Sequence, residues 1–250
     1  ETLLGSVSKV TEWDLAKQNI QSPELRVEND CIPVIAGTIE AQKRGYQWHR
    51  FDWKGNKNKL AAKLVLAVSA LARKNFGDDK VTLRVPADLR RYMDESDGLT
   101  VSNCSGAIDL LIPADATVNS VRSQLITAMR HKRDLAPFRP HHKYSRWIPK
   151  PWFHSDPQKL MALHQRRRYR MTGTISYLGE LSLADFQCDS FSTNSLFGVP
   201  IPFENRPVFI AACTFNSNTS IIIGCPSAIA SMPELEIFSH QLSELLSGFD

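Results

Sequence analysis

The sequence predicts an α/β fold, in which a mixed β-sheet is covered by helices. Three observations support this. Residues 56–75 have an almost wholly apolar interior, which is typical of a helix buried on most sides. Several short runs alternate apolar and polar residues, as strands with one buried face do. Strand and helix patterns also alternate along the chain, which favours helices packed on a sheet over separate blocks.

Length and composition limit the alternatives. The chain has 250 residues and a formal charge of +4, with 42% hydrophobic and 22% charged residues. This is a globular balance with enough apolar side chains for one large core or two modest ones. No apolar run reaches the roughly 18 residues of a bilayer span, and the first residues lack the pattern of a signal peptide. Since the sequence does not begin with Met, we expect a fragment of a longer polypeptide.

The cysteines argue against a disulfide scaffold. Their number is odd and no two form a CxxC pair. We therefore expect buried free thiols in a reducing cytoplasm and no metal site. We also expect no permanently bound cofactor. The five residues are Cys31, Cys104, Cys188, Cys213 and Cys225.

The expected elements follow from periodicity and from residues that begin or end helices. Residues 1–46 are predicted to be a connector with short elements, one of them a strand within 32–39, and residues 47–250 the main domain. The helix at 56–75 has Asn56 and Asn58 as candidate N-caps and Gly77 as its C-terminal stop. Strands are expected at 47–53, 80–86, 107–113, 172–178, 206–215 and 219–225, and further helices at 117–133, 159–169 and 233–246.

The most informative stretch is 81–106, VTLRVPADLRRYMDESDGLTVSNCSG. A strand runs into an Asp88-Leu89-Arg90 turn, and a second strand leaves through Asn103 and Gly106. Together with the preceding buried helix, this succession resembles the chloramphenicol acetyltransferase-like superfamily, which includes the condensation domains of nonribosomal peptide synthetases and related acyltransferases. The run Ile-Ser-Tyr-Leu-Gly at 175–179 is similar to the family's Ser-Asn-Leu-Gly strand, with Tyr177 in place of Asn. The likeness covers residues 47–250 and implies one subdomain of the family's fold, its C-terminal half.

The resemblance implies a reaction as well. Members of the family transfer an acyl group from a coenzyme A or carrier-protein thioester to an alcohol, amine or thiol. Their base is the second His of a His-His-x-x-x-Asp-Gly loop in the first half, because imidazole accepts a proton near neutral pH. This chain has His141-His142, but Arg146 and Trp147 stand where Asp and Gly are needed. The expected catalytic His therefore lies in an N-terminal half, supplied by the same parent chain or by a second one. An acyl or peptidyl carrier protein, with its phosphopantetheinyl arm, is the other implied partner.

The candidate site residues each have a structural alternative. Asp88 and Arg90 are expected to form an ion pair or turn at the strand end, in preference to a polar clamp beside the channel. Ser176 and Tyr177 are candidate hydrogen-bond donors to a tetrahedral oxyanion, or ordinary strand residues. Asn103 is a candidate for the channel lining, or part of a turn.

One basic segment, 130–170, has 12 Lys and Arg residues against 2 acids, and it is also rich in aromatic residues and proline. Its final cations are the candidate partner-binding residues, for an acidic carrier protein or the phosphate of a coenzyme A or pantetheine arm. A second hypothesis follows, a noncatalytic interaction module that binds an acidic carrier protein through this tract. A solvated loop is the structural alternative, and single-stranded nucleic acid ranks below a carrier protein. The candidate cations are Arg166, Arg167, Arg168 and Arg170.

Overall fold

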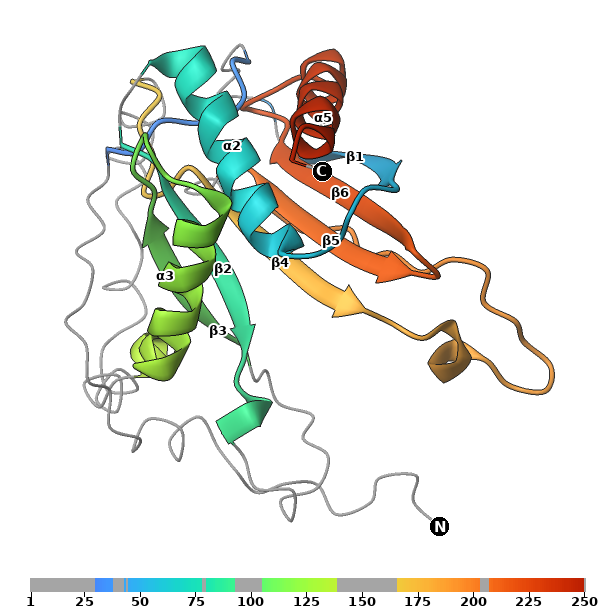
Figure 1. The fold of residues 1–250 in the computed structure, drawn as a ribbon. Coiled ribbons are helices and arrows are strands. Elements are labelled where there is room, and N and C mark those ends of the chain that lie inside the picture. The colour runs from blue at the N-terminus through green and yellow to red at the C-terminus, as the bar shows by residue number, and fades with distance from the viewer. Residues whose placement is uncertain are drawn as a thin grey trace, which may run out of the picture.

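A computed structural model describes residues 30–37, 43, 45–77, 80–92, 105–138, 166–202 and 207–249. Its centre is a six-stranded sheet (Figure 1). The inner strands β2, β4 and β5 are parallel to one another, whereas β1, β3 and β6 are antiparallel to their neighbours. The predicted mixed sheet is thereby confirmed. In spatial order the strands are β1 (Tyr46–Trp53), β6 (Asn218–Pro226), β5 (Phe209–Phe215), β4 (Gly173–Glu180), β2 (Thr82–Asp88) and β3 (Ser105–Leu111).

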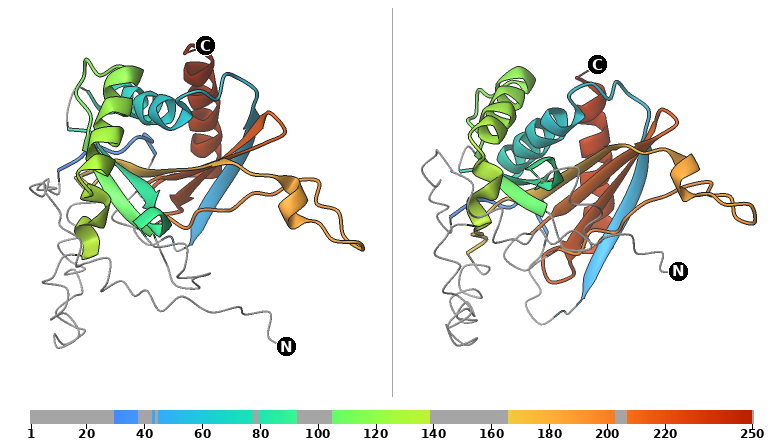
Figure 2. Two further views of the ribbon diagram at one scale, coloured as in Figure 1. Left: turned by 60° about the horizontal axis from the view of Figure 1, so that its bottom comes forward. Right: turned by 90° about the horizontal axis from the view of Figure 1, so that it is seen from below.

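Three α-helices cover one face of this sheet (Figure 2). They are α2 (Leu60–Phe76), α3 (Val118–Arg130) and α5 (Met232–Ser247). The core lies between the helices and the inward side chains of the strands, such as Leu83, Ile175 and Ile210, each at most 1% exposed. We call the other side of the sheet the open face. Because side chains alternate along a strand, every second residue of each strand belongs to it.

Helix α2 lies between α3 and α5, and most of its residues are buried. It ends as expected at Gly77, which has a φ of 86° and whose N–H donates to the Arg73 carbonyl at 2.8 Å. Its start is later than predicted. The Asn56 side chain accepts a hydrogen bond from the Asn58 N–H at 2.9 Å, and Lys59 has a φ of 59°. This turn keeps the backbone out of the helix until Leu60.

The C-terminal hairpin and helix match their predictions. Asn216 and Ser217 connect β5 to β6 with φ angles of 44° and 69°. Two adjacent left-handed residues suit the right-handed twist of a hairpin. The following helix α5 begins at a capping box, in which the Glu234 carboxylate accepts hydrogen bonds from the Ser231 N–H at 2.6 Å and from its hydroxyl at 2.7 Å.

Two expected elements are wrong within the described residues. Residues 32–37 form no strand, although Ile32, Val34 and Ile35 are buried in the core. The helix expected at 159–169 does not extend over 166–169, and residues 159–165 lie outside the described part. Instead Tyr169 exchanges backbone hydrogen bonds of 2.9 and 3.0 Å with Cys31. A buried pairing with a distant segment has overridden the local helical pattern, which sequence periodicity does not reveal.

Within the part of the chain that the structure describes, no helix is both long and apolar enough to cross a bilayer.

Candidate functional site

Strand β4 lies near the middle of the sheet and presents Thr174 and Ser176 to the open face. Thr174 is directly across from Arg84 on β2, and Ser176 is across from Ala211 on β5. Thr174 is only 2% exposed, and Ser176 is half-buried. The Thr174 hydroxyl has no hydrogen-bond partner. Ser176 therefore stands on a partly covered surface where a hydroxyl can donate a hydrogen bond to a ligand.

Tyr177 points to the opposite side of the same strand. It packs against the core beneath the helices, and its hydroxyl lies 3.3 Å from the Thr214 hydroxyl. Thr214 in turn is 2.9 Å from the hydroxyl of Thr219. The alternation of the strand thus separates Ser176 from Tyr177, and the structure does not bring these two candidate donors together. Of the pair, Ser176 alone lies on the open face.

A charged pair next to Thr174 was not predicted. The guanidinium of Arg84 binds the Asp109 carboxylate through two hydrogen bonds of 2.6 and 2.7 Å. The two residues face each other in the register of β2 and β3, and their side chains are 17% and 18% exposed. Two parallel N–H···O bonds hold both groups rigidly and cancel their charges. The register of β2 and β3 would have identified this pair, but the sequence alone does not specify that register.

Asp88 and Arg90 form an ion pair at the end of β2. The carboxylate accepts from the Arg90 backbone N–H at 2.9 Å and from its guanidinium at 2.7 Å. The side chains are 54% and 70% exposed. The hydrogen bond from the Arg90 side chain lowers the pKa of Asp88. The interaction closes the strand and begins the single turn η1 (Arg90–Tyr92).

The next two residues bind a buried carboxylate, a contact that was not predicted from the sequence. The Arg91 guanidinium binds the carboxylate of Asp134, and the Tyr92 hydroxyl donates to the same carboxylate at 2.9 Å. The Asp134 side chain is fully buried, and Leu89 beside this turn is 0% exposed. Burial, followed by the hydrogen bond to Asp134, raises the pKa of Tyr92. We call Arg91, Tyr92 and Asp134 the Asp134 cluster. It fastens η1 to the turn η3 (Arg133–Phe138).

The described residues place no histidine on the strand of Ser176 or on the strands next to it. The histidines among them are His49 on β1, His131 after α3 and His240 on α5. None belongs to β4 or to its neighbours β2 and β5. The described part of the chain also has no group of three His, Cys, Asp or Glu side chains suited to a metal. Asn103, Cys104, His141 and His142 lie outside the described residues.

Of the four candidate arginines, Arg167 lies at the C-terminal end of α2. Arg167 is half-buried, with its guanidinium 5.7 Å from the ring centroid of Phe76. Arg168 donates to the Asp30 carbonyl at 2.9 Å. Arg166 and Arg170 are exposed. The structure therefore places two of the four as anchors and leaves two accessible to a partner.

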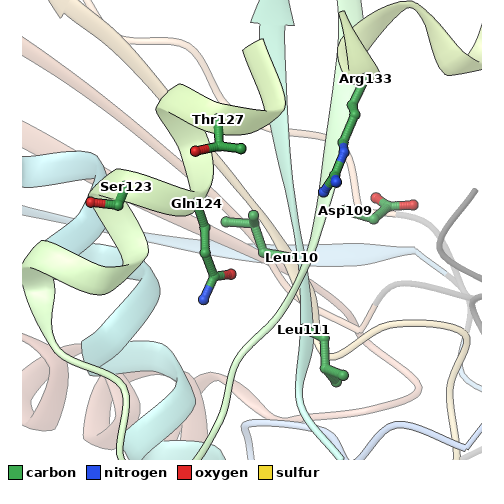
Figure 3. A pocket seen from close by; sticks show the side chains of 7 residues that line it. All are labelled: Asp109, Leu110, Leu111, Ser123, Gln124, Thr127 and Arg133. Atoms are coloured by element: carbon green, nitrogen blue, oxygen red, sulfur yellow. The ribbon is translucent and has the colours of Figure 1, made fainter. Parts of the chain in front are cut away.

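A hollow of about 280 Å³ opens where α3 meets the outer strand β3 (Figure 3). It wraps around the edge of the sheet, because Leu110 faces the core while Asp109 and Leu111 face the other way. None of the predicted site residues lines it. Its lining consists of Asp109, Leu110, Leu111, Ser123, Gln124, Thr127 and Arg133.

The cysteines differ in their expected reactivity. Cys188 is exposed, and hydrogen bonds from the backbone and side chain of Ser190 lower its pKa. Burial raises the pKa of Cys225 to about 12. Since the thiolate is the nucleophile, iodoacetamide at pH 8 should alkylate Cys188 at least about tenfold faster than Cys225. Peptide mapping by mass spectrometry follows each site, and Cys188→Ser should remove the signal of the fast site. Equal rates at the two cysteines would contradict this prediction.

No protein-family model matches the sequence, and no curated protein matches it. Solved structures do share its fold. The condensation domain of the monacolin K polyketide synthase aligns with 92% of this chain and 55% of its own, with a TM-score of 0.54 and 10% identity. A mutant starter condensation domain of rhizomide synthetase, in complex with C8-CoA and Leu-SNAC, aligns with 88% of this chain and 48% of its own, with a TM-score of 0.51 and 10% identity.

A four-domain nonribosomal peptide synthetase bound to AMP and glycine gives a TM-score of 0.56 at 12% identity, over 88% of this chain and 18% of that much longer one. The present chain thus has the fold of part of a condensation domain. It spans about half the length of the condensation domains that it matches.

Proposed function

We propose that this chain is the C-terminal subdomain of an enzyme that transfers an acyl group from a carrier-protein or coenzyme A thioester to an alcohol, amine or thiol. One observation carries the proposal. About nine-tenths of this chain aligns with condensation domains, but the aligned part is only about half of each such domain. On this proposal the remaining half supplies the His-His-x-x-x-Asp-Gly loop.

An apolar arm supports the idea of a missing partner half. Residues 181–195 leave β4 and extend beyond the sheet (Figures 1 and 2). Residues 196–202 then return against the sheet, where the Leu196 carbonyl accepts a hydrogen bond from the Cys213 thiol at 3.7 Å. The arm includes Phe186 and Phe191, which are 41% and 62% exposed. Large apolar side chains gathered on one exposed segment mark an interaction surface. We propose that the arm packs against the His-bearing half.

In the proposed reaction the imidazole of the other half removes the proton from the acceptor hydroxyl, amine or thiol. The freed electron pair attacks the thioester carbonyl, and the resulting tetrahedral intermediate expels the thiolate, which takes up the proton. Ser176 is our candidate for a hydrogen bond to the oxyanion, since it is the predicted donor that stands on the open face. One such donor is worth roughly 10² to 10³ in kcat.

The test is an acyl-transfer assay with a panel of acyl-CoA donors. We expect no turnover by the 250-residue chain alone, and turnover when the chain carries the segment that precedes it in its parent polypeptide. Robust turnover by the chain alone that is abolished by His142→Ala would overturn the claim that the base lies elsewhere. In the complete enzyme, Ser176→Ala should lower kcat more than Ser190→Ala, a change on the exposed arm.

The exposed arginines favour a second candidate function, a noncatalytic module that binds an acidic carrier protein. Arg166 and Arg170 flank anchored residues and are free of the contacts that hold Arg167 and Arg168 to the fold. Two cations presented from a fixed turn suit the acidic surface of a partner.

This second function predicts binding of an acyl carrier protein that weakens as salt increases. The variant Arg166→Glu with Arg170→Glu should lose the binding. The control changes Lys54 and Arg122, which are also exposed, to Glu and alters the net charge equally. Equal losses in the two variants would show that net charge alone is responsible and would reject the arginine site. Titration with a labelled single-stranded oligonucleotide would detect nucleic-acid binding instead.

A further inference from the structure

The outer edge of β1 is an unpaired side of the sheet. β1 is the terminal strand in the spatial order, and β6 is its only partner among the described strands. The strand is eight residues long and displays Tyr46 and Trp48, which are 48% and 40% exposed. Long edge strands with exposed aromatic residues tend to pair with another strand, and proteins usually protect them.

The hydrogen-bond pattern shows which backbone groups point outward. The N–H of Ser227 donates to the Gly45 carbonyl at 3.0 Å, in register with the β1–β6 ladder. In an antiparallel pair the residues that bond to the neighbour alternate with those that do not. Residues 45, 47, 49, 51 and 53 therefore face β6. The N–H and C=O groups of Trp48, Arg50 and Asp52 point away from the sheet, towards any added strand.

The side chains of the same three residues lie on the open face and are complementary to their own inverted copy. Suppose that two β1 strands lie antiparallel and cross at Phe51. Arg50 of each copy then stands opposite Asp52 of the other, and Trp48 stands opposite Lys54. Both combinations are favourable across strands, the first as an ion pair and the second as a cation over an aromatic ring. This register also pairs outward-pointing residues with each other, as the ladder requires.

Arg50 and Asp52 are available for this role. Their side chains are 27% and 43% exposed, and they contact each other within one copy at 3.2 Å. The Arg50 guanidinium also lies 4.6 Å from the ring centroid of Phe197, which is 6.1 Å from the Trp48 ring. The cation is thereby held at the strand edge beside two partly exposed aromatic rings.

We propose that two copies of this chain associate through β1 by antiparallel edge-to-edge pairing about Phe51, which joins two six-stranded sheets into one. We infer a second copy as the partner because the charges along the strand are complementary to those of the same strand rotated about a two-fold axis. Such an axis makes each contact that lies off the axis occur twice. The pairing surface is one strand edge, well below the roughly 800 Å² per partner of stable complexes. We therefore expect a reversible dimer.

The test is sedimentation velocity on the full 250-residue chain at concentrations from about 1 to 100 µM, the range in which small interfaces associate. We expect a rise in the weight-average sedimentation coefficient from monomer towards dimer. Arg50→Asp alone and Asp52→Arg alone should each weaken association roughly tenfold to hundredfold, since each turns two attractive contacts into repulsive ones. The double variant Arg50→Asp with Asp52→Arg should restore dimerisation, because the opposite charges again face each other.

A urea unfolding curve for each variant separates lost association from lost folding, so a variant is compared only when its midpoint matches the parent chain. Three results would overturn the proposal: a monomer at every concentration, a dimer that neither single variant weakens, or a double variant as weak as the singles. A dimer that responds instead to Phe191→Ser on the apolar arm would assign the contact to that arm and reject the strand edge.

Discussion

Gly106→Ala should lower the free energy of unfolding by about 3 kcal/mol, at the upper end of the range for overpacking. Gly106 lies on β3, where its Cα packs directly against the turn that carries Asp134. A Cβ built there would overlap the Asp134 carbonyl oxygen and stand 2.7 Å from a methyl group of Leu89. Backbone cannot yield as a flexible side chain can, so β3 or η3 has to move. Urea titration followed by tryptophan fluorescence measures the change.

Gly198→Ala is the matched control for this experiment. A Cβ at Gly198 has no neighbour within 4 Å, and the residue does not require a left-handed backbone. Its unfolding free energy should stay within about 0.5 kcal/mol of the parent chain, as for most surface substitutions. If both alanine variants unfold at the same urea concentration, the close packing of β3 against η3 is not what stabilises this part of the fold.

Arg91→Met should be the second strongly destabilising change, with a loss of about 3 kcal/mol. The substitution keeps much of the side-chain volume but leaves the carboxylate of Asp134 buried with only the Tyr92 hydroxyl as a side-chain donor from its cluster. The Arg91 side chain is 36% exposed, but the Asp134 carboxylate is fully buried, and removing the cation is costly because that carboxylate loses its charged partner. Thermal and urea unfolding both report the loss.

The adjacent arginine provides an internal comparison. Arg90 also binds an aspartate, but its side chain is 70% exposed and that of Asp88 54%. Exposed ion pairs contribute at most about 1 kcal/mol. Arg90→Met should therefore unfold close to the parent chain. A loss as large as that of Arg91→Met would contradict the distinction between a pair with a buried carboxylate and a fully exposed pair.

The two neighbouring arginines also show what the sequence can and cannot predict. Period and composition identified every strand of the described sheet and all three α-helices, because buried faces impose a repeat on the sequence. The turn at Asp88 and Arg90 was predictable because its partners are two residues apart. Arg91 binds a residue 43 positions away, and no local pattern encodes such a contact. The contact between Arg84 and Asp109 is likewise not encoded locally, because it depends on the register of β2 and β3.

The candidate site was predicted only in part for a similar reason. Strand alternation, applied to Ser176 and Tyr177, shows from the sequence that they point to opposite faces, but it does not say which face the helices cover. That assignment depends on how α2 packs on β4, which is a property of the whole sheet. The resemblance in fold could be recognised from the order of the segments. The catalytic residues could not be predicted, because on our proposal they belong to the other half of the enzyme.

The pairing of β1 with β6 affects how the protein is made. Trp53 and its partner Thr219 are separated by more than 160 residues, so the first described strand pairs with the last. At about 5 to 20 residues per second, β1 waits roughly ten to thirty seconds for its neighbour to be synthesised. During that interval its aromatic side chains and both backbone edges are open to other chains. Nascent chains of this protein should therefore depend on chaperones until β6 emerges, and chains truncated before Asn218 should aggregate.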